Sequence, residues 1–199
     1  MGDYSKAEPL YERMLKVEEK AHGPDHTATA TSLNNLALLY DQMGAYDKAE
    51  PLYQRASKIY EKSLRPNHPD AGKAFGNLAS HYRKMGDYGK AEPLQLRALK
   101  IHETALGSNH PDVAISLLNL GELYQDTGLY AKAEPLYLRA LKIRETALGA
   151  DNPKTAAACD TLALFYWTTG KSAKAESFSQ RAGNIREQNK EPARTNAGA

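Results

Sequence analysis

The sequence predicts an all-α fold, a solenoid of antiparallel helix hairpins, from three observations. The 199 residues repeat with a period of 42, marked by KAEPL at Lys6, Lys48, Lys90 and Lys132 and by KAESF at Lys174. Each unit places apolar residues at the spacing of two amphipathic helices. No unit shows a strand pattern. One hairpin cannot bury its own apolar face, whereas stacked hairpins can, so the repeat predicts a solenoid.

The first predicted element is a lone helix over residues 3–21. The opening MGDYSKAEPL nearly repeats MGDYGKAEPL at 85–94, so this helix copies the second helix of a repeat. Its residues Leu10, Tyr11 and Met14 are expected to form an exposed N-terminal edge, because one side has no neighbouring helix. Three explanations stay open: the edge forms a homodimer, it binds a partner, or the chain is a fragment that lacks an upstream half-repeat.

Four hairpins follow, over residues 26–64, 68–106, 110–148 and 152–189. The first helix of the first hairpin is predicted over 27–43, where Leu33, Leu36 and Tyr40 form an apolar stripe. In later repeats HPD marks the helix start, since proline suits a first helical position and aspartate suits its positive end. The preceding histidines, His26, His68 and His110, are expected to act as helix-start residues. Gly44 and its equivalents are expected to cap the helix end in a left-handed conformation.

The second helix of the first hairpin is predicted over 47–64. Ala49, Tyr53 and Ile59 are expected to face inward, and Pro51 to lie near the first turn, where its missing N–H is tolerated. The recurring Arg55 and Glu61 series is expected to pair between helices. Residues 1–190 are predicted to form a single solenoid domain and 191–199 a disordered tail.

Composition limits the classes of partner and location. The formal net charge is +2 and charged residues make up 25% of the chain, a balance too mild to indicate nucleic-acid binding. No apolar run approaches the length of about 18 residues that a membrane span needs, and the N-terminus lacks the apolar stretch of a signal peptide. The single Cys159 excludes an internal disulfide framework. These features predict a cytoplasmic protein, with membrane association through basic residues as a weaker alternative.

The sequence shows no catalytic constellation. It contains no GxGxxG, P-loop or HExxH motif. The repeated histidines lie on repeat-equivalent points, which are too far apart to share a metal ion. Cys159 occupies a core position that is Leu33 in the first repeat, so it is expected to be a buried, inert thiol. The sequence therefore predicts a protein that is not an enzyme and has no cofactor or metal.

The segments SLNNLALLYDQMGAYDKAEPLYQRA and LGSNHPDVA resemble the tetratricopeptide repeat of the kinesin light chain type. That variant has a unit of 42 residues in place of the usual 34. The resemblance covers residues 1 to about 189 and implies a right-handed superhelix of about nine helices. No heptad segment matches the long coiled coil of the motor subunit, so the chain is more similar to a stand-alone bacterial kinesin-light-chain-like protein. Some such proteins are associated with bacterial tubulin filaments.

Within the first helices, some positions change from repeat to repeat while their neighbours recur. They are spaced 3, 4 and 3 residues apart, so they share one stripe. In the tetratricopeptide family first-helix residues line the concave groove, so the resemblance implies a groove that binds a segment of a partner protein. The predicted groove residues are Thr31, Asn34, Leu38, Asp41, Lys73, Ser80, Arg83, Leu118, Glu122, Gln125, Asp160 and Trp167. The alternative is that this stripe only faces solvent and that its residues vary without a role in binding.

Trp167 and Arg83 are the predicted anchors of this groove, because exposed tryptophan and arginine are enriched at binding hot spots. For Trp167 the alternative is packing as a cap under the last helix or the tail. Arg83 is expected to form a small basic patch with Lys73, Lys84 and His81, or an ordinary solvated face.

In the light-chain family an asparagine at the position of Asn34 bonds the ligand backbone. Later repeats replace it by Gly76, Leu118 and Asp160, which departs from the family's site for acidic-tryptophan cargo motifs. The sequence thus predicts an adaptor that binds proteins, with a cytoskeletal protein on a tubulin-like filament as the alternative.

Overall fold

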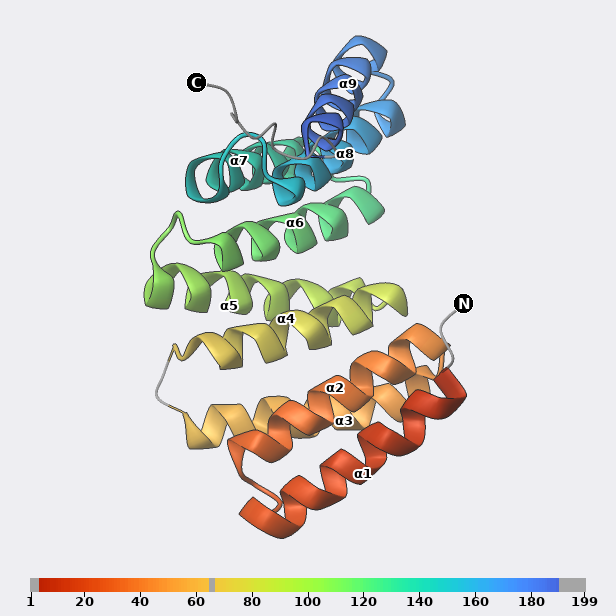
Figure 1. Ribbon diagram of the computed structural model, residues 1–199, viewed down its shortest axis with the longest axis vertical. Coiled ribbons are helices and arrows are strands. Elements are labelled where there is room, and N and C mark those ends of the chain that lie inside the picture. The colour runs from red at the N-terminus through yellow and green to blue at the C-terminus, as the bar shows by residue number, and fades with distance from the viewer. Residues whose placement is uncertain (1–3, 65–66, 190–199) are drawn as a thin grey trace, which may run out of the picture. The chain divides into compact units, whose positions relative to one another are not determined.

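The computed structural model describes residues 4–64 and 67–189, and in those residues it contains nine helices and no strand (Figure 1). The helices are α1 (Tyr4–His22), α2 (Thr27–Met43), α3 (Tyr46–Ser63), α4 (Pro69–Lys84), α5 (Tyr88–Leu106), α6 (Pro111–Asp126), α7 (Tyr130–Leu148), α8 (Pro153–Thr168) and α9 (Ser172–Gln188). They agree closely with the predicted elements. The predicted tail, 191–199, lies outside the described residues.

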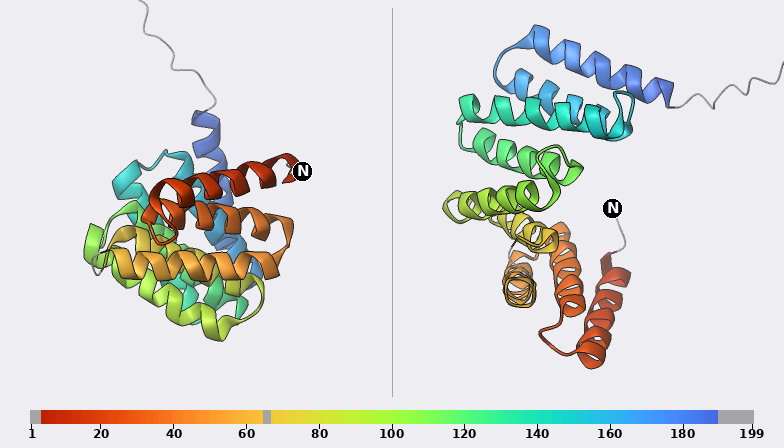
Figure 2. Two further views of the ribbon diagram at one scale, coloured as in Figure 1. Left: turned by 90° about the horizontal axis from the view of Figure 1, so that it is seen from below. Right: turned by 90° about the vertical axis from the view of Figure 1, so that its left-hand side faces the viewer.

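The helices fall into two compact units, Met1–Gly107 and Ser108–Ala199. In unit 1, α1 packs on α2, the hairpins α2–α3 and α4–α5 form, and α3 packs on α4 (Figures 1 and 2). In unit 2, the hairpins α6–α7 and α8–α9 form and α7 packs on α8. The single domain over 1–190 and the right-handed superhelix stay predictions.

The start of each first helix is capped by the side chain that precedes it. The Nδ1 atoms of His26, His68 and His110 accept hydrogen bonds from the backbone N–H two residues later, at 3.1–3.2 Å. In the fourth repeat Asn152 makes the same bond at 2.9 Å. These side chains satisfy one of the free N–H groups at each helix start. The prediction that the histidines act as helix-start residues is confirmed.

The turn inside each hairpin depends on glycine. Gly44, Gly86, Gly128 and Gly170 have φ between 73° and 77°, a left-handed conformation that other residues adopt at a cost. The second helix begins directly afterwards. Pro51 is the sixth residue of α3, just after the first turn and near it as expected. It is exposed, so water can reach the carbonyl that its missing N–H leaves unbonded.

The KAEP motif connects the helices of one hairpin through its lysine and alanine. The alanines are buried, at 0–1% exposure, and their small size lets the two helices approach closely: Ala49, Ala91, Ala133 and Ala175. Each lysine amine lies 4.8–5.0 Å from the ring centroid of a first-helix tyrosine: Lys48 on Tyr40, Lys90 on Tyr82, Lys132 on Tyr124 and Lys174 on Tyr166. Such cation–π contacts join the two helices of a hairpin.

The glutamate of the motif connects one hairpin to the next. Within unit 1 the Tyr82 hydroxyl donates to Glu50 at 2.8 Å, and within unit 2 the Tyr166 hydroxyl donates to Glu134 at 2.9 Å. Burial and this carboxylate together raise the pKa of Tyr166 to about 12. A single tyrosine therefore receives a lysine from its own hairpin and a carboxylate from the preceding one.

A second series of polar contacts joins successive second helices. The predicted pairing of the arginine and glutamate series is seen at Arg55–Glu19 (2.7 Å), Arg97–Glu61 (2.6 Å) and Arg181–Glu145 (2.5 Å). These pairs are partly exposed, so each contributes little to stability. Their effect is to fix the register of neighbouring hairpins.

Each unit has its own apolar core. In unit 1, Leu33, Phe75 and Ile101 belong to one buried cluster formed by α2 to α5. In unit 2 the aromatic ring of Phe165 packs against Tyr137 at 5.4 Å between centroids. Cys159 is fully buried in this unit, and burial raises the pKa of its thiol. Cys159 therefore lies in the core, as its position in the repeat predicted.

Gly121 and Gly183 provide a matched test of packing in unit 2. A Cβ atom at Gly121 would lie 2.6 Å from Cε1 of the buried Tyr137, whereas a Cβ at Gly183 meets nothing within 4 Å. Gly121→Ala is therefore expected to lower the free energy of unfolding by about 1–3 kcal/mol. Gly183→Ala is expected to raise it by about 0.5–1 kcal/mol, because both sites are helical. Urea unfolding followed by circular dichroism measures both, and equal effects would contradict the packing described.

The pH dependence of the free energy of unfolding tests the contacts of Glu134. Hydrogen bonds from Lys171, Tyr166 and Lys174 hold the pKa of Glu134 below its ordinary value of 4.5. A carboxyl with a lowered folded-state pKa stabilises the protein above its unfolded-state pKa, and this stabilisation is lost as the pH falls through the folded-state value. Glu134→Gln is thus expected to cost about 0.5–1.5 kcal/mol at neutral pH and little in acid. The exposed Glu176→Gln variant is the control, and its unfolding should match the wild type throughout.

Candidate protein-interaction surface

In unit 1 the predicted groove residues lie on α2 and α4, and most face solvent at least in part. Thr31 and Lys73 are exposed, while Asn34, Leu38, Ser80 and Arg83 are half-buried. The Thr31 hydroxyl lies 2.7 Å from the hydroxyl of Tyr60. Asn34 accepts a hydrogen bond from the Asn77 amide at 3.1 Å, which ties α2 to α4. The accessible part of this surface is polar and carries cations on α4.

Asp41 differs from the prediction, because its side chain is only 2% exposed. It accepts hydrogen bonds from Nδ1 of His81 at 2.6 Å, from the Tyr53 hydroxyl at 3.3 Å and from Lys84 at 3.3 Å. Burial raises the pKa of Tyr53, with the Asp41 carboxylate as a further cause. Asp41 is therefore a structural centre between α2, α3 and α4, and is not accessible to a partner.

His81 also differs from its predicted place in a basic surface patch. Its side chain is 0% exposed, and it packs against the rings of Tyr46, Tyr53 and Tyr82. The equivalent residues in the other repeats are Leu39, Leu123 and Phe165. His81 thus fills a core position, where its ring nitrogen needs the Asp41 carboxylate. The basic patch on α4 is reduced to Lys73, Arg83 and Lys84.

In unit 2 the predicted groove residues of α6 contribute less surface than those of α8. Leu118 is buried at 8% exposure. Glu122 and Gln125 are half-buried, and Gln125 accepts a hydrogen bond from the Tyr137 hydroxyl at 3.0 Å. That bond repeats the one from Tyr53 to Asp41. On α8, Asp160 is half-buried and pairs with Arg186 of α9.

The exposed face of α8 is apolar. Trp167 is 51% exposed and Leu164 is 64% exposed, and they lie three residues apart on one face of the helix. Ile115 on α6 is 49% exposed. Neither Leu164 nor Ile115 was among the predicted groove residues, although both occupy positions of the variable stripe. Large apolar side chains at those positions were the available signal.

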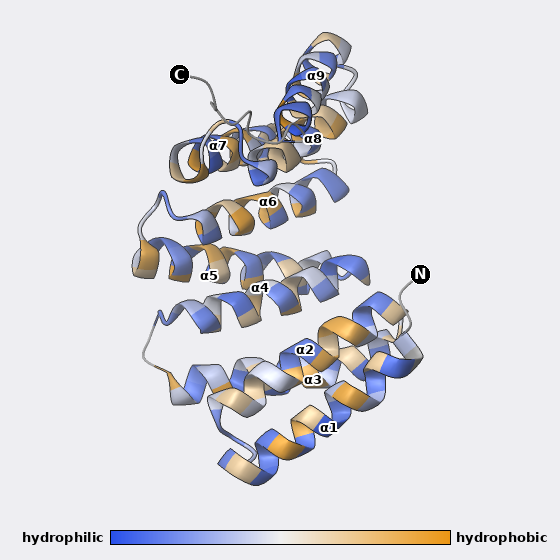
Figure 3. Ribbon diagram, viewed as in Figure 1, coloured by the Kyte–Doolittle hydropathy of each residue, from blue (hydrophilic) through white to orange (hydrophobic). Residues whose placement is uncertain are grey.

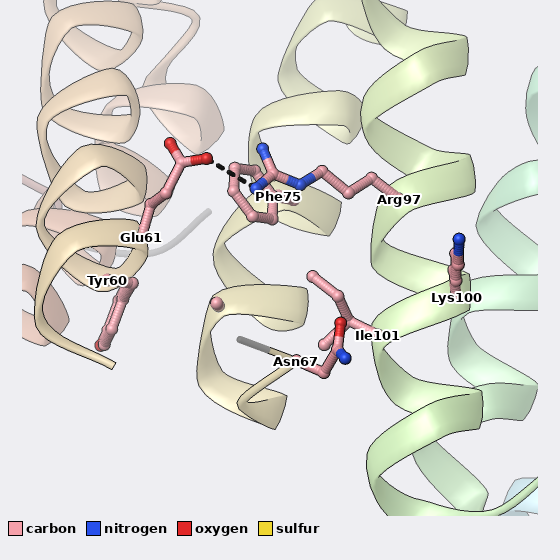
Figure 4. A pocket seen from close by; sticks show the side chains of 8 residues that line it. Tyr60, Glu61, Asn67, Phe75, Arg97, Lys100 and Ile101 are labelled. Carbon is pink, nitrogen blue, oxygen red and sulfur yellow. Dashed lines mark hydrogen bonds and ion pairs between the residues drawn. The ribbon is translucent and has the colours of Figure 1, made fainter. Parts of the chain in front are cut away.

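A pocket of about 280 Å³ lies elsewhere in unit 1, between α3, α4 and α5 (Figure 4). The Arg97 guanidinium stacks on the Phe75 ring at 4.0 Å from its centroid and pairs with Glu61 at 2.6 Å. Tyr60 and Ile101 line the remaining wall. Glu61 and Arg97 therefore bind one another within the pocket, and Lys100 also lines it.

The described ranges, 4–64 and 67–189, contain neither a metal-binding cluster nor a membrane-spanning helix. No cluster of three or more histidine, cysteine, aspartate or glutamate side chains is arranged to hold a metal ion. No helix there combines the length and the apolar character needed to cross a bilayer.

The family follows from comparison with known sequences. A tetratricopeptide repeat model matches residues 1–62, 70–146 and 116–188, and a second tetratricopeptide repeat model matches residues 34–105. The chain belongs to the tetratricopeptide repeat family. Tetratricopeptide repeats generally serve as scaffolds for protein–protein interaction, so the chain has the fold of a protein-binding scaffold. No curated protein matches the sequence.

Solved structures narrow the type of tetratricopeptide repeat. BtubC (BKLC) from P. vanneervenii is 28% identical, with a TM-score of 0.79 over 100% of this chain and 79% of that one. A Podospora anserina putative kinesin light chain with nearly identical repeats is 25% identical, with a TM-score of 0.74 over 96% and 90% of the two chains. MamA, at 18% identity and a TM-score of 0.59, shares the fold. The chain is thus an all-α repeat solenoid similar to the kinesin light chain type.

Substitution of two aspartates of the predicted groove tests which of them stabilises the fold. Asp41→Ala leaves His81 buried without its carboxylate, so it is expected to lower the free energy of unfolding by about 3–5 kcal/mol. Asp160→Ala removes a partly exposed ion pair and is expected to cost about 0–1 kcal/mol. Chemical denaturation of both variants measures the difference. A small loss in Asp41→Ala would contradict the structural role of Asp41.

Proposed function

We propose that the chain is an adaptor that binds a segment of a partner protein on the exposed face of its first helices. The observation that carries the proposal is the pair Leu164 and Trp167, which expose large apolar side chains on α8. Removing such side chains from water favours association, and exposed aromatic residues are typical anchors of interfaces.

The rest of the surface supplies specificity in this proposal. In unit 1, Lys73 and Arg83 on α4 offer positive charge, and in unit 2, Glu122 on α6 offers negative charge. Charge of this kind orients a ligand and excludes wrong partners more than it adds affinity. The bound segment is expected to be a peptide with an apolar or aromatic anchor and charged flanks.

In this proposal the chain is not an enzyme and binds no cofactor, nucleic acid or membrane. It is located in the cytoplasm. Repeat proteins of this family generally bind proteins on extended surfaces. The mild net charge of +2 gives no reason to expect a polyanion as partner.

A second candidate function is decoration or stabilisation of a tubulin-like filament. The observation that favours it is the similarity to BtubC (BKLC), which extends over 100% of this chain. Co-sedimentation of the purified chain with bacterial tubulin filaments tests it. Recovery of the chain in the pellet only when filaments are present would support this function over the binding of a soluble peptide.

Leu164→Glu/Trp167→Ala tests the leading proposal. Wild type and variant are each used to capture proteins from a lysate of the source organism, and the captured proteins are identified by mass spectrometry. A partner that the wild type retains should be lost at least about tenfold from the variant, since the anchor pair supplies more than 1.4 kcal/mol.

Leu138→Ser is the matched control, because Leu138 is 40% exposed on the second helix α7. It should retain the same partner as the wild type. Equal retention by Leu164→Glu/Trp167→Ala, with its helix content intact, would overturn the proposed binding face.

A further inference from the structure

The outward face of α1 carries four exposed large apolar side chains that do not belong to the first-helix face. Leu10, Tyr11, Met14 and Val17 are 65%, 36%, 52% and 55% exposed, and Figure 3 shows apolar segments along this helix. No large apolar residue of α9, the other terminal helix of the described residues, is exposed to this degree. Of these two helices, only α1 therefore exposes large apolar side chains.

Comparison with other second helices shows what normally covers this face. Tyr53 and Ile59 of α3 are the repeat equivalents of Tyr11 and Val17, and they are 1% and 3% exposed. In α9, which packs on the first helix of its own hairpin, the equivalent of Val17 is Ile185, at 4% exposure. The exposed face of α1 is thus the one that a first helix covers in every complete hairpin.

Met14 changes the shape of that face. Its equivalents are all alanine and are all 0% exposed: Ala56, Ala98, Ala140 and Ala182. Alanine lets the first helix of a hairpin approach closely, and a methionine in its place holds a helix further away. A helix that covers α1 is therefore expected to pack through larger side chains. Its axis is expected to lie further from the axis of α1 than in a hairpin, within the usual range of about 8–10 Å between packed helices.

The apolar residues of α1 form a coiled-coil type of seam. Ala7, Leu10, Met14, Val17 and Ala21 are spaced 3, 4, 3 and 4 residues apart. This is the spacing of the two apolar positions of a heptad, which pack against a partner helix along its length. Because α1 is already folded on α2, a partner helix does not have to supply the energy for folding it.

Charge is divided between the two sides of α1. The acidic residues Glu8, Glu12 and Glu19 face the body of unit 1, where they contact Lys48, Tyr40 and Arg55. The edge beside Leu10 and Val17 carries Lys6, Arg13 and Lys20 at intervals of seven residues. Arg13 and Lys20 are exposed and form no ion pair with a described residue.

The other edge of the seam is mixed in character. It carries Tyr11 and Glu18, and the Glu18 carboxylate pairs with His22 at 3.5 Å. A second copy of the chain would bring another positive edge to the seam, whereas an acidic helix would bring charges of opposite sign.

We propose that the outward face of α1 docks an amphipathic helix of another protein, with large apolar side chains at heptad spacing and carboxylates beside them. This surface belongs to unit 1 and α8 to unit 2, so it gives the adaptor a second contact. The apolar seam supplies the affinity, and Arg13 and Lys20 select the acidic helix.

Two labelled peptides of about 21 residues test the proposal against the full chain by fluorescence anisotropy. Both carry leucine at the apolar heptad positions, one with glutamate at the flanking positions and the other with lysine. The glutamate peptide is expected to bind about tenfold more tightly, and 1 M salt should reduce this preference because charges are then screened beyond about 3 Å. Equal binding of the two peptides would overturn the proposed selection.

Variants of α1 locate the binding. Arg13→Glu/Lys20→Glu should reverse the preference, and Leu10→Ser/Met14→Ser should weaken both peptides by about tenfold or more. Lys62→Glu/Lys142→Glu, which reverses two exposed lysines of other second helices, is the matched control and should bind as the wild type. The same should hold for Leu164→Glu/Trp167→Ala, which separates this proposal from the proposed function. Unchanged binding by Arg13→Glu/Lys20→Glu would contradict the proposal.

The mass of the chain in solution tests the competing occupant. Static light scattering after size exclusion is expected to give a monomer for the wild type and for Leu10→Ser/Met14→Ser. A wild-type dimer that this variant converts to a monomer would show that a second copy covers α1, and the proposal of an acidic partner helix would then be wrong.

Discussion

The contact on which the stack depends is the tyrosine hydroxyl of a first helix against the glutamate of the preceding second helix, with a lysine over the same ring. At Tyr166 the hydroxyl donates to Glu134 at 2.9 Å, and Lys174 lies 4.9 Å from the ring centroid. The tyrosine is largely buried, so its hydroxyl must find a partner, and the neighbouring hairpin supplies it. A repeat that keeps these three residues therefore stacks on its neighbour in one register.

A scaffold held by recurring residues leaves the remaining positions free to differ, and the two units differ where first helices are exposed. In unit 1 the variable positions include a buried aspartate, Asp41, and cations on α4. In unit 2 they include Leu164 and Trp167, whose side chains are more than half exposed. The same backbone thus presents a polar face in one unit and an apolar face in the other. This is the property expected of an adaptor whose partner is selected by side chains alone.

Helix α1 is a second place where sequence and scaffold separate. Met14 occupies a position that is alanine in every complete hairpin of the described residues, and it is 52% exposed. Glu8 and Glu19 meanwhile contact Lys48 and Arg55, as their equivalents do at Glu134–Lys174 and Glu61–Arg97. The inner side of α1 therefore follows the rules of the scaffold, while the outer side follows those of a binding surface.

The sequence by itself determined the period, the helices and their caps, because these depend on local residues: histidine or asparagine before a helix, glycine after it, and apolar side chains at helical spacing. It also indicated which positions were variable. Only the tertiary structure decided which variable residues reach solvent. Asp41 and Trp167 occupy equivalent positions, yet Asp41 is buried because His81, from the next repeat, brings a ring nitrogen that needs a carboxylate. At the equivalent Gln125 the residue 40 positions further on is Phe165, which carries no such nitrogen, and Gln125 is half-buried. The exposure of Asp41 therefore depended on His81, which lies 40 positions further along the chain. Helical periodicity alone does not reveal this contact.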